Sequence, residues 1–219
     1  EMVHAASLIL DDLPCMDDAH QRRGRPTTHR QFDEATAILA SVGLLNRAFG
    51  VVAQDPGLSD SLKAELGSRL SEAVGFQGLV AGQAMDLGDR DRARSPADLD
   101  LLNHRKTGVL MVAAAEAGAL IAGASGDAVR AVGEFARHLG LAFQIHDDLI
   151  DAEGGDAGKD VGKDAGMTTI VSALGADGAL EAIESHLEAA ESALAAAGAG
   201  GGLLAPYALG LFEARKAAA

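Results

Sequence analysis

Aromatic residues, cysteine and proline are all scarce in this 219-residue sequence. Tryptophan is absent, and one tyrosine and six phenylalanines bring the aromatic share to 3%. The single cysteine, Cys15, excludes an intramolecular disulfide and a thiolate metal cage. A protein of this kind is typical of a reducing compartment, so we expect a cytoplasmic location.

Lysine and arginine are also scarce relative to aspartate and glutamate. The sequence has 18 Lys and Arg against 32 Asp and Glu, which leaves a net charge of −14. Because phosphate-rich and anionic surfaces need a basic face, this balance argues against nucleic acid or an anionic membrane as the main partner. No uninterrupted apolar run reaches the ~18 residues of a membrane span, so we expect no stable membrane insertion.

Alanine and leucine dominate the apolar residues, which make up 48% of the chain, and this favours helix over sheet. Apolar positions recur at three- and four-residue spacing, which predicts helices over 34–53, 59–88, 95–123, 127–152 and 175–197. No repeat or linker interrupts them, so we expect one all-α domain over 1–219. Glu1–His4 reads as the middle of a helix, and we expect a longer natural N-terminus to precede it.

A first acidic cluster lies in "LILDDLPCMDDAHQRRG", residues 8–24. Pro14 cannot continue a helix, so the helix should end near Asp12 and a turn should bring Asp17 back toward it. Crowded carboxylates repel one another unless a cation binds them. Arg22 and Arg23 follow, which suggests an anion between the arginines and that cation.

A second cluster lies in "QIHDDLIDAEGGDAGKDVGKD", residues 144–164, at the end of an apolar helix. Asp147 and Asp151 are four residues apart and share a helix face. Mg²⁺ takes oxygen ligands and is commonly held by one or two carboxylates plus substrate phosphates. A single Asp-Asp pair is usually a solvated helix end. Two such clusters, each followed by basic residues, favour a Mg²⁺–diphosphate site.

With these motifs the sequence resembles the trans-isoprenyl diphosphate synthases, most closely the bacterial geranylgeranyl diphosphate synthases of carotenoid pathways. "HAASLILDDLPCMDDAHQRRGRPTTH" is similar to the family's first aspartate-rich motif, and "DDLID" to the second. "GLVAGQAMDL", "HRKTGVLM" and "GKDVGKDAG" are similar to three further signatures in the right order. The resemblance covers essentially the whole chain.

The resemblance implies a role for each matching residue. Mg²⁺, three ions per active site, would be held by Asp11, Asp12, Asp17, Asp147, Asp148 and Asp151. The allylic diphosphate would be held by Arg22, Lys106, Thr107, Gln144 and Lys159. Isopentenyl diphosphate would be held by His4 and Arg23. The residues essential for turnover would be Asp11, Asp12, Asp17, Lys106, Asp147 and Asp148.

The implied fold is a bundle of long helices around a central apolar cavity, assembled as a homodimer. The implied reaction joins isopentenyl diphosphate to farnesyl diphosphate or a shorter allylic diphosphate, giving geranylgeranyl diphosphate. The small Ala6 and Ser7, one turn before Asp11, favour this product over farnesyl diphosphate, because shorter-chain relatives commonly carry a bulky aromatic there. A farnesyl diphosphate synthase and a non-catalytic partner subunit are the alternatives. A terpene cyclase is disfavoured by the few aromatics.

Two features depart from the family pattern. Met167 stands where many relatives have Lys, so we expect one diphosphate contact to be lost or taken over by Lys163. The family's Gly-Lys-Arg segment, which contacts isopentenyl diphosphate, would lie upstream of the helix that carries His4 and is not in this sequence. An enzyme without that segment should be crippled.

Overall fold

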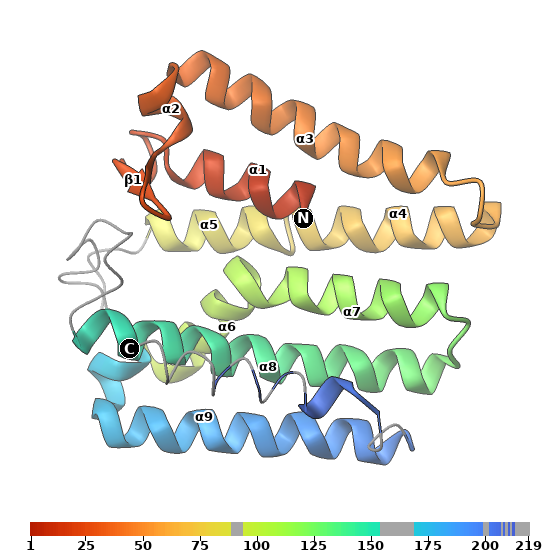
Figure 1. Ribbon diagram of the computed structural model, residues 1–219. Coiled ribbons are helices and arrows are strands. Elements are labelled where there is room, and N and C mark those ends of the chain that lie inside the picture. The colour runs from red at the N-terminus through yellow and green to blue at the C-terminus, as the bar shows by residue number, and fades with distance from the viewer. Residues whose placement is uncertain are drawn as a thin grey trace. The chain divides into compact units, whose positions relative to one another are not determined.

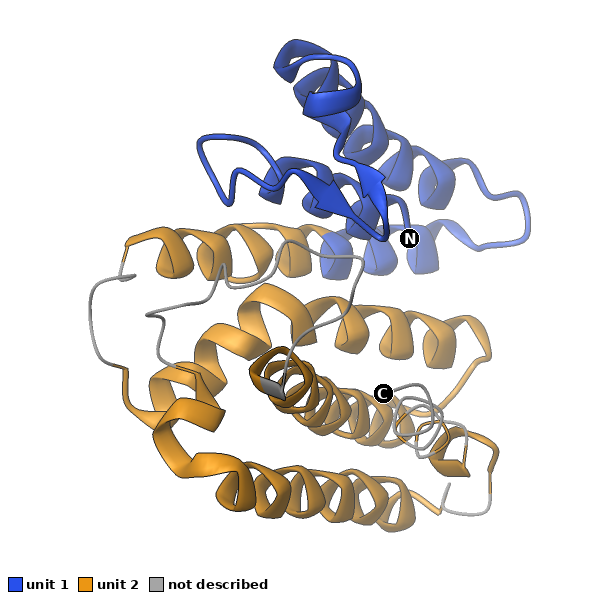
Figure 2. Ribbon diagram, turned by 60° about the vertical axis from the view of Figure 1, so that its left-hand side comes forward, with its two compact units in different colours: residues 1–70, 153–166 blue, residues 71–152, 167–219 orange. Residues whose placement is uncertain are grey.

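The computed structural model describes residues 1–88, 94–153, 169–198, 202–206, 208, 210 and 212. Lys159, Lys163 and Met167, which the sequence analysis singles out, lie outside these described residues. Helices dominate, which confirms the all-α fold class (Figure 1). The chain divides into two compact units (Figure 2). The first holds residues 1–70 and Glu153, and the second holds 71–152 and the described residues from 169 onward.

The first unit is built around α1 and α3, which pack side by side (Figure 1). Its elements are α1 (Met2–Asp11), β1 (Gln21–Arg22), β2 (Arg25–Pro26), α2 (Thr28–Gln31), α3 (Glu34–Gln54) and the first part of α4 (Asp60–Val74). The Asp33 side chain caps α3 by accepting a hydrogen bond from the Thr36 N–H at 2.6 Å. The helix therefore begins where the sequence pattern places it.

A small antiparallel hairpin, which the sequence analysis missed, follows the first acidic cluster. Gln21 pairs with Pro26, and Arg22 pairs with Arg25. The turn residues Arg23 and Gly24 both have positive φ, +53° and +73°. Two-residue hairpin turns of this kind match the twist of the strands. Because Arg23 is not a glycine, the sequence lacks the usual signal for such a turn.

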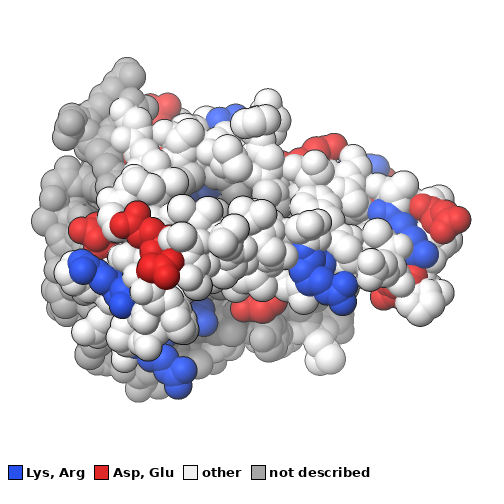
Figure 3. All heavy atoms as spheres, turned by 90° about the horizontal axis from the view of Figure 1, so that it is seen from above, with Lys and Arg blue, Asp and Glu red and all other residues white. Residues whose placement is uncertain are grey.

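The outward face of α3 is apolar. Leu39 and Val42 are 71% and 57% exposed, and Ile38 and Val51 are also exposed. Seen from above, much of the visible surface is uncharged between separate charged groups (Figure 3). By length and composition alone, α3 could cross a membrane, although polar residues interrupt its sequence. No uninterrupted apolar run of that length is present, and the expected lack of stable membrane insertion stays a prediction.

The second unit is a helical bundle whose core lies between α6, α8 and α9. Its elements are α5 (Leu79–Gly88), α6 (Pro96–Asn103), the π-helical turn η1 (His104–Gly108), α7 (Val109–Ile121), α8 (Gly126–Glu153) and α9 (Ile170–Ala196). Leu99, Ile145 and Ile183 are among the buried core residues. The expected central cavity between helices stays a prediction.

Three predicted helices differ in their boundaries. The segment 59–88 forms two helices, because Gly75 and Gly78 fall in one turn where helix propensity is lowest. The segment 95–123 starts at a Ser95 capping box, as expected, but η1 divides it. The last predicted helix begins at Ile170 and is kinked at Gly175, the residue where the sequence pattern placed its start.

Candidate active site

The first acidic cluster forms a tight turn after α1. The helix ends at Asp11, three residues before Pro14, as the proline predicts. The Asp17 N–H then donates to the Asp11 carbonyl at 3.0 Å, and the Ala19 N–H donates to the Asp12 carbonyl at 3.1 Å. The turn therefore brings the backbone of Asp17 back to that of Asp11, which confirms the predicted turn. That Asp17 binds the same ions as Asp11 stays a prediction.

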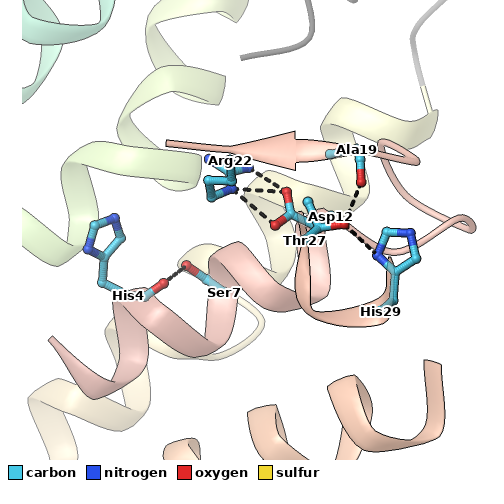
Figure 4. Close-up of polar contacts among 7 residues, drawn as sticks. All are labelled: His4, Ser7, Asp12, Ala19, Arg22, Thr27 and His29. Atoms are coloured by element: carbon cyan, nitrogen blue, oxygen red, sulfur yellow. Dashed lines mark hydrogen bonds and ion pairs between the residues drawn. The ribbon is translucent and has the colours of Figure 1, made fainter. Parts of the chain in front are cut away.

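Asp12 and Arg22 form a bidentate ion pair within the first unit (Figure 4). The Arg22 Nε and NH2 groups donate to Asp12 Oδ1 at 2.9 and 2.8 Å, and Nε lies 3.1 Å from Oδ2. Asp12 is only 3% exposed. The pair fixes the hairpin strand β1 onto the end of α1, because such forked contacts allow one geometry only.

The charges around Arg22 show how acidic this end of the unit is. Burial lowers the pKa of the guanidinium, but the hydrogen bond to Asp12 and the negative charges of Asp12, Asp11 and Asp17 outweigh it. The net result is a raised pKa. One arginine thus sits in the field of three carboxylates. A further cation would be attracted to the same place.

Hydrogen bonds fasten the far end of this loop as well (Figure 4). The Thr27 hydroxyl donates to the Ala19 carbonyl at 2.7 Å, and Thr27 Oγ1 lies 3.2 Å from Nδ1 of the buried His29. No pattern in the sequence predicts a role for these two residues. Their contacts hold both ends of the segment from Ala19 to His29, so the backbone that carries Arg22 and Arg23 is held in place.

His4 and Arg23, predicted to bind isopentenyl diphosphate, are both more exposed than the residues of this ion pair. The His4 side chain projects from α1 and is 43% exposed, with Nδ1 3.7 Å from Glu1 Oε1 (Figure 4). Arg23 is exposed in the turn of the hairpin. Both side chains are accessible to a ligand, and their binding role stays a prediction.

In the second unit, three predicted site residues form a hydrogen-bonded chain. The Thr107 hydroxyl in η1 donates to Gln144 Oε1 at 3.2 Å, and Gln144 Nε2 donates to Asp148 Oδ1 at 3.0 Å. Gln144 and Asp148 are one turn apart on α8, so they share a face. This chain joins the Lys106–Thr107 motif to the second aspartate motif, as expected for one binding site.

The second aspartate motif occupies the last turns of α8, which ends at Glu153. Asp147 and Asp148 are half-buried, and Asp151 is exposed. The carbonyls at a helix C-terminus already carry partial negative charge, so carboxylates are unfavourable there without a cation. The position of these aspartates therefore fits a metal-binding role better than a capping role.

The donor set in both motifs fits Mg²⁺, because carboxylate oxygens are hard ligands. Among the residues that the structure describes, no three His, Cys, Asp or Glu side chains already converge on one metal position. Each unit supplies its own part of the donor set. A common ion position stays a prediction, as do the individual ligands.

Comparison with known sequences decides the family. Residues 1–189 match the polyprenyl synthetase family along their whole length. The chain belongs to the polyprenyl synthetase family. The aspartate motifs and the Lys106–Thr107 motif of this polyprenyl synthetase all lie within the matched residues.

Its relatives make prenyl diphosphates. A geranylgeranyl diphosphate synthase of Pantoea ananas is 48% identical over 197 residues, which cover 90% of this chain and 65% of the relative. One of Pseudescherichia vulneris is 44% identical over 207 residues, covering 94% and 67%. A farnesyl diphosphate synthase of Geobacillus stearothermophilus is 43% identical over 211 residues, covering 94% and 71%. The chain thus spans about two thirds of the length of these relatives.

Solved structures agree on the fold. A geranyltransferase of Helicobacter pylori, complexed with magnesium and isoprenyl diphosphate, matches with a TM-score of 0.85 at 29% identity. The match covers all of this chain and 72% of that one. An FPP/GFPP synthase of Zymomonas mobilis matches with a TM-score of 0.80 at 34% identity, covering 94% and 69%. The arrangement of helices is therefore that of a prenyl synthase.

Sequence reasoning missed one group of residues in this polyprenyl synthetase. Asp86 accepts a hydrogen bond from Lys106 Nζ at 2.7 Å, and both Asp86 and Arg94 are buried. The signal was available, because Asp86 lies in the "GLVAGQAMDL" motif. No local pattern, however, indicates which residue an aspartate on α5 will contact 20 positions later.

Proposed function

We propose that the protein is a Mg²⁺-dependent, chain-elongating prenyltransferase. It condenses isopentenyl diphosphate with farnesyl diphosphate or a shorter allylic diphosphate and releases geranylgeranyl diphosphate. The observation that carries the proposal is that residues of both aspartate motifs are held in place by hydrogen bonds. Asp17 is folded back on Asp11, and Asp148 is bonded through Gln144 to Thr107.

The chemistry needs a good leaving group. When bound to Asp11, Asp17 and Asp147, Mg²⁺ supplies charge neutralisation to the departing diphosphate. Lys106 and Gln144 bind the allylic diphosphate and orient it by donating hydrogen bonds to its oxygens, and Thr107, whose hydroxyl proton is donated to Gln144 Oε1, orients the Gln144 amide. Arg22, fixed by Asp12, adds positive charge at the first motif. No protein nucleophile is required. The bond between the allylic carbon and the diphosphate oxygen breaks, the isopentenyl double bond attacks that carbon, and a proton then passes to the released diphosphate.

We propose that the second substrate, isopentenyl diphosphate, binds to His4 and Arg23 and not to the aspartates. His4 and Arg23 are exposed cationic or hydrogen-bonding side chains of the first unit, suited to a diphosphate that is not cleaved. Held there, isopentenyl diphosphate would be oriented for attack on the allylic substrate.

We further propose a cytoplasmic homodimer. Support for the dimer comes from α3, whose exposed Leu39 and Val42 would be covered by a second copy of the chain. Leu39→Glu places a charge on that face and should give monomers in light scattering after size-exclusion chromatography. The single cysteine supports a reducing location.

Incubation of labelled isopentenyl diphosphate with either geranyl diphosphate or farnesyl diphosphate, with and without Mg²⁺, tests the activity. Chromatography of the dephosphorylated product should show geranylgeraniol only with Mg²⁺. Farnesol made from geranyl diphosphate, with no further elongation, would instead indicate a farnesyl diphosphate synthase. No turnover alone, together with activation of a second prenyl synthase, would indicate a partner subunit.

Product length is tested separately at Ala6, which is fully buried in α1 one turn before Asp11. Ala6→Phe should shift the main product to farnesyl diphosphate, because one helical turn of about 5.4 Å is comparable to one isoprene unit. Ser7→Phe, on the same turn, is the companion variant. Unchanged product from both variants would show that Ala6 and Ser7 do not determine the product length.

A further inference from the structure

The contact between α5 and η1 is unusually close for two helical segments. A Cβ atom on Gly82 would lie 2.5 Å from the Lys106 backbone nitrogen and 2.7 Å from the Arg105 carbonyl carbon. No side chain fits at this position, because the obstructing atoms are backbone. The backbone of α5 therefore lies directly against the residue that presents the Lys106 side chain.

Two side-chain contacts extend this backbone contact along α5. Asp86 is one turn after Gly82, on the same face, and accepts a hydrogen bond from Lys106 Nζ at 2.7 Å. Its neighbour Met85 accepts a hydrogen bond through Sδ from Arg105 at 3.4 Å. One turn of α5 thus contacts both the backbone and the side chains of η1.

Asp86 is itself held in place. Its side chain is 8% exposed, and NH1 of the equally buried Arg94 lies 4.0 Å from Oδ1. Arg94 NH2 also donates to the carbonyls of Met85 and Asp86 at 2.8 and 3.4 Å, in the last turns of α5. Among the residues that the structure describes, Asp86 therefore contacts the cationic side chains of Arg94, which is also bonded to carbonyls of α5, and Lys106, which comes from η1.

We propose that Asp86 is a positioning residue for Lys106, and that the turn of α5 from Gly82 to Asp86 sets where the Lys106 ammonium meets the allylic diphosphate. This inference rests on the proposed function and extends it to a residue outside both aspartate motifs. The Lys106 side chain is 30% exposed, against 8% for Asp86. The Lys106 side chain is thus bonded to a buried carboxylate while part of it stays accessible to a ligand.

Lysine needs such an anchor more than arginine does, because its charge is carried on a flexible four-carbon stem. An ammonium has three N–H donors, so it can bond Asp86 and a diphosphate oxygen together. The π-helical geometry of η1 supports the same interpretation, since π turns within helices are frequent at functional sites. Thr107, the next residue, is fixed separately by Gln144.

A purely electrostatic role for Asp86 gives the opposite expectation. Removing a carboxylate close to a bound diphosphate removes repulsion, so binding would tighten. Loss of an anchor weakens binding, because Lys106 must then be ordered by the ligand itself. The sign of the change therefore separates the two roles.

The test is a double-mutant cycle of Asp86→Asn and Lys106→Gln, read by calorimetric binding of inorganic diphosphate in the presence of Mg²⁺. We expect each single variant to bind about 10-fold more weakly, and the double variant to match Lys106→Gln within about twofold. In turnover, Asp86→Asn should raise the KM for the allylic substrate and leave that for isopentenyl diphosphate unchanged. A general loss of structure would change both.

Glu134→Gln is the matched control, because it removes one carboxylate from another ion pair of the second unit, 2.9 Å from Arg137. It should bind diphosphate as the wild type does. Equal or tighter binding by Asp86→Asn, or additive losses in the cycle, would overturn the positioning role while wild-type turnover still supports the proposed function. A wild type that neither turns over nor binds diphosphate overturns both.

Discussion

The two aspartate motifs are built in opposite ways. The first is held by contacts close in sequence: Asp17 bonds back to Asp11, and Arg22 pairs with Asp12 ten residues earlier. The second lies on a regular helix and depends on distant partners. Thr107 reaches Gln144 across 37 positions, and Asp86 and Lys106 are 20 positions apart.

The difference teaches where each motif is vulnerable. In the first unit one loop carries both the carboxylates and their counter-charge, so a local change affects geometry and charge together. In the second unit the aspartates lie on the regular helix α8, so their backbone positions do not depend on their hydrogen-bond partners. The position of Lys106 and Thr107 relative to these aspartates is set by the contacts that hold η1. Stability should therefore respond to loss of the Asp12–Arg22 pair in the first motif, and positioning should respond to substitutions around the second.

The largest expected effect is common to both motifs. Asp11→Ala and Asp147→Ala should each lower product formation by at least about 100-fold, because each removes a predicted Mg²⁺ ligand. The free energy of unfolding should change by less than about 1 kcal/mol, since neither carboxylate is deeply buried. Mg²⁺ with diphosphate should raise the melting temperature of the wild type but not of the variants. Near wild-type turnover in either variant would contradict the ligand assignment.

Much of the first motif could be predicted from sequence, because Pro14 ends a helix by local sterics and a short turn then returns the chain. The contacts that position the second motif could not be predicted from sequence. The π turn at Lys106 depends on how closely Gly82 lets α5 approach, which is a property of tertiary packing. The hairpin at Arg23 escaped prediction for a different reason, since its strands are two residues long and its turn lacks a leading glycine.

A second prediction separates the two motifs by stability. Asp12→Asn should cost about 2–3 kcal/mol, because it leaves the partly buried Arg22 guanidinium without its ion-pair partner. Asp148→Asn should cost less than about 1 kcal/mol, because the amide oxygen still accepts from Gln144. Urea unfolding followed by circular dichroism measures both. Equal costs would mean that the motifs are not built differently.

A third prediction concerns the frame of the second motif. Gly82→Ala should destabilise the protein by about 1–3 kcal/mol, because its Cβ has no room against the Lys106 backbone. Gly118→Ala is the control, since nothing lies within 4 Å of a Cβ there and alanine favours the interior of α7. The control should be neutral or up to about 1 kcal/mol more stable. A neutral Gly82→Ala would show that η1 can move away from α5 at no cost.

A fourth prediction uses pH to sharpen the contrast between units. In the second unit, burial lowers the pKa of His104, His138 and His186, and the charge of Arg137 lowers all three further. Below the ordinary value of 6.5 the unfolded chain therefore binds more protons than the folded one. Stability from these histidines is fully present above pH 6.5 and is lost as the pH falls toward their folded pKa values.

Amide hydrogen exchange at pH 7.0 and 5.5, corrected for intrinsic rates, should show this loss in α8 and α9. His138→Gln combined with His186→Gln should flatten the dependence, and His20→Gln, an exposed histidine of the first unit, should not. Burial raises the pKa of Asp100, which gives the opposite slope just above its ordinary value of 3.8. Measurement at pH 5.5 and above keeps the histidine effect separate. An unchanged slope in the double variant would contradict the assignment.

The smallest expected effect lies in the hairpin of the first unit, where stability and binding should change in opposite directions. Arg23 adopts φ = +53°, which is unfavourable for a side chain with a Cβ. Arg23→Gly should therefore stabilise the protein by about 0.5 kcal/mol, after the greater entropy of glycine in the unfolded chain is allowed for. Arg23→Ala removes the same charge but keeps the strain, so it should give no such gain. Both variants should raise the KM for isopentenyl diphosphate equally, because both remove the guanidinium proposed to bind it. If their KM values stay at the wild-type level, Arg23 does not bind this substrate. If their stabilities coincide, the left-handed turn is not maintained in solution, and the hairpin does not hold the arginines as the first motif requires.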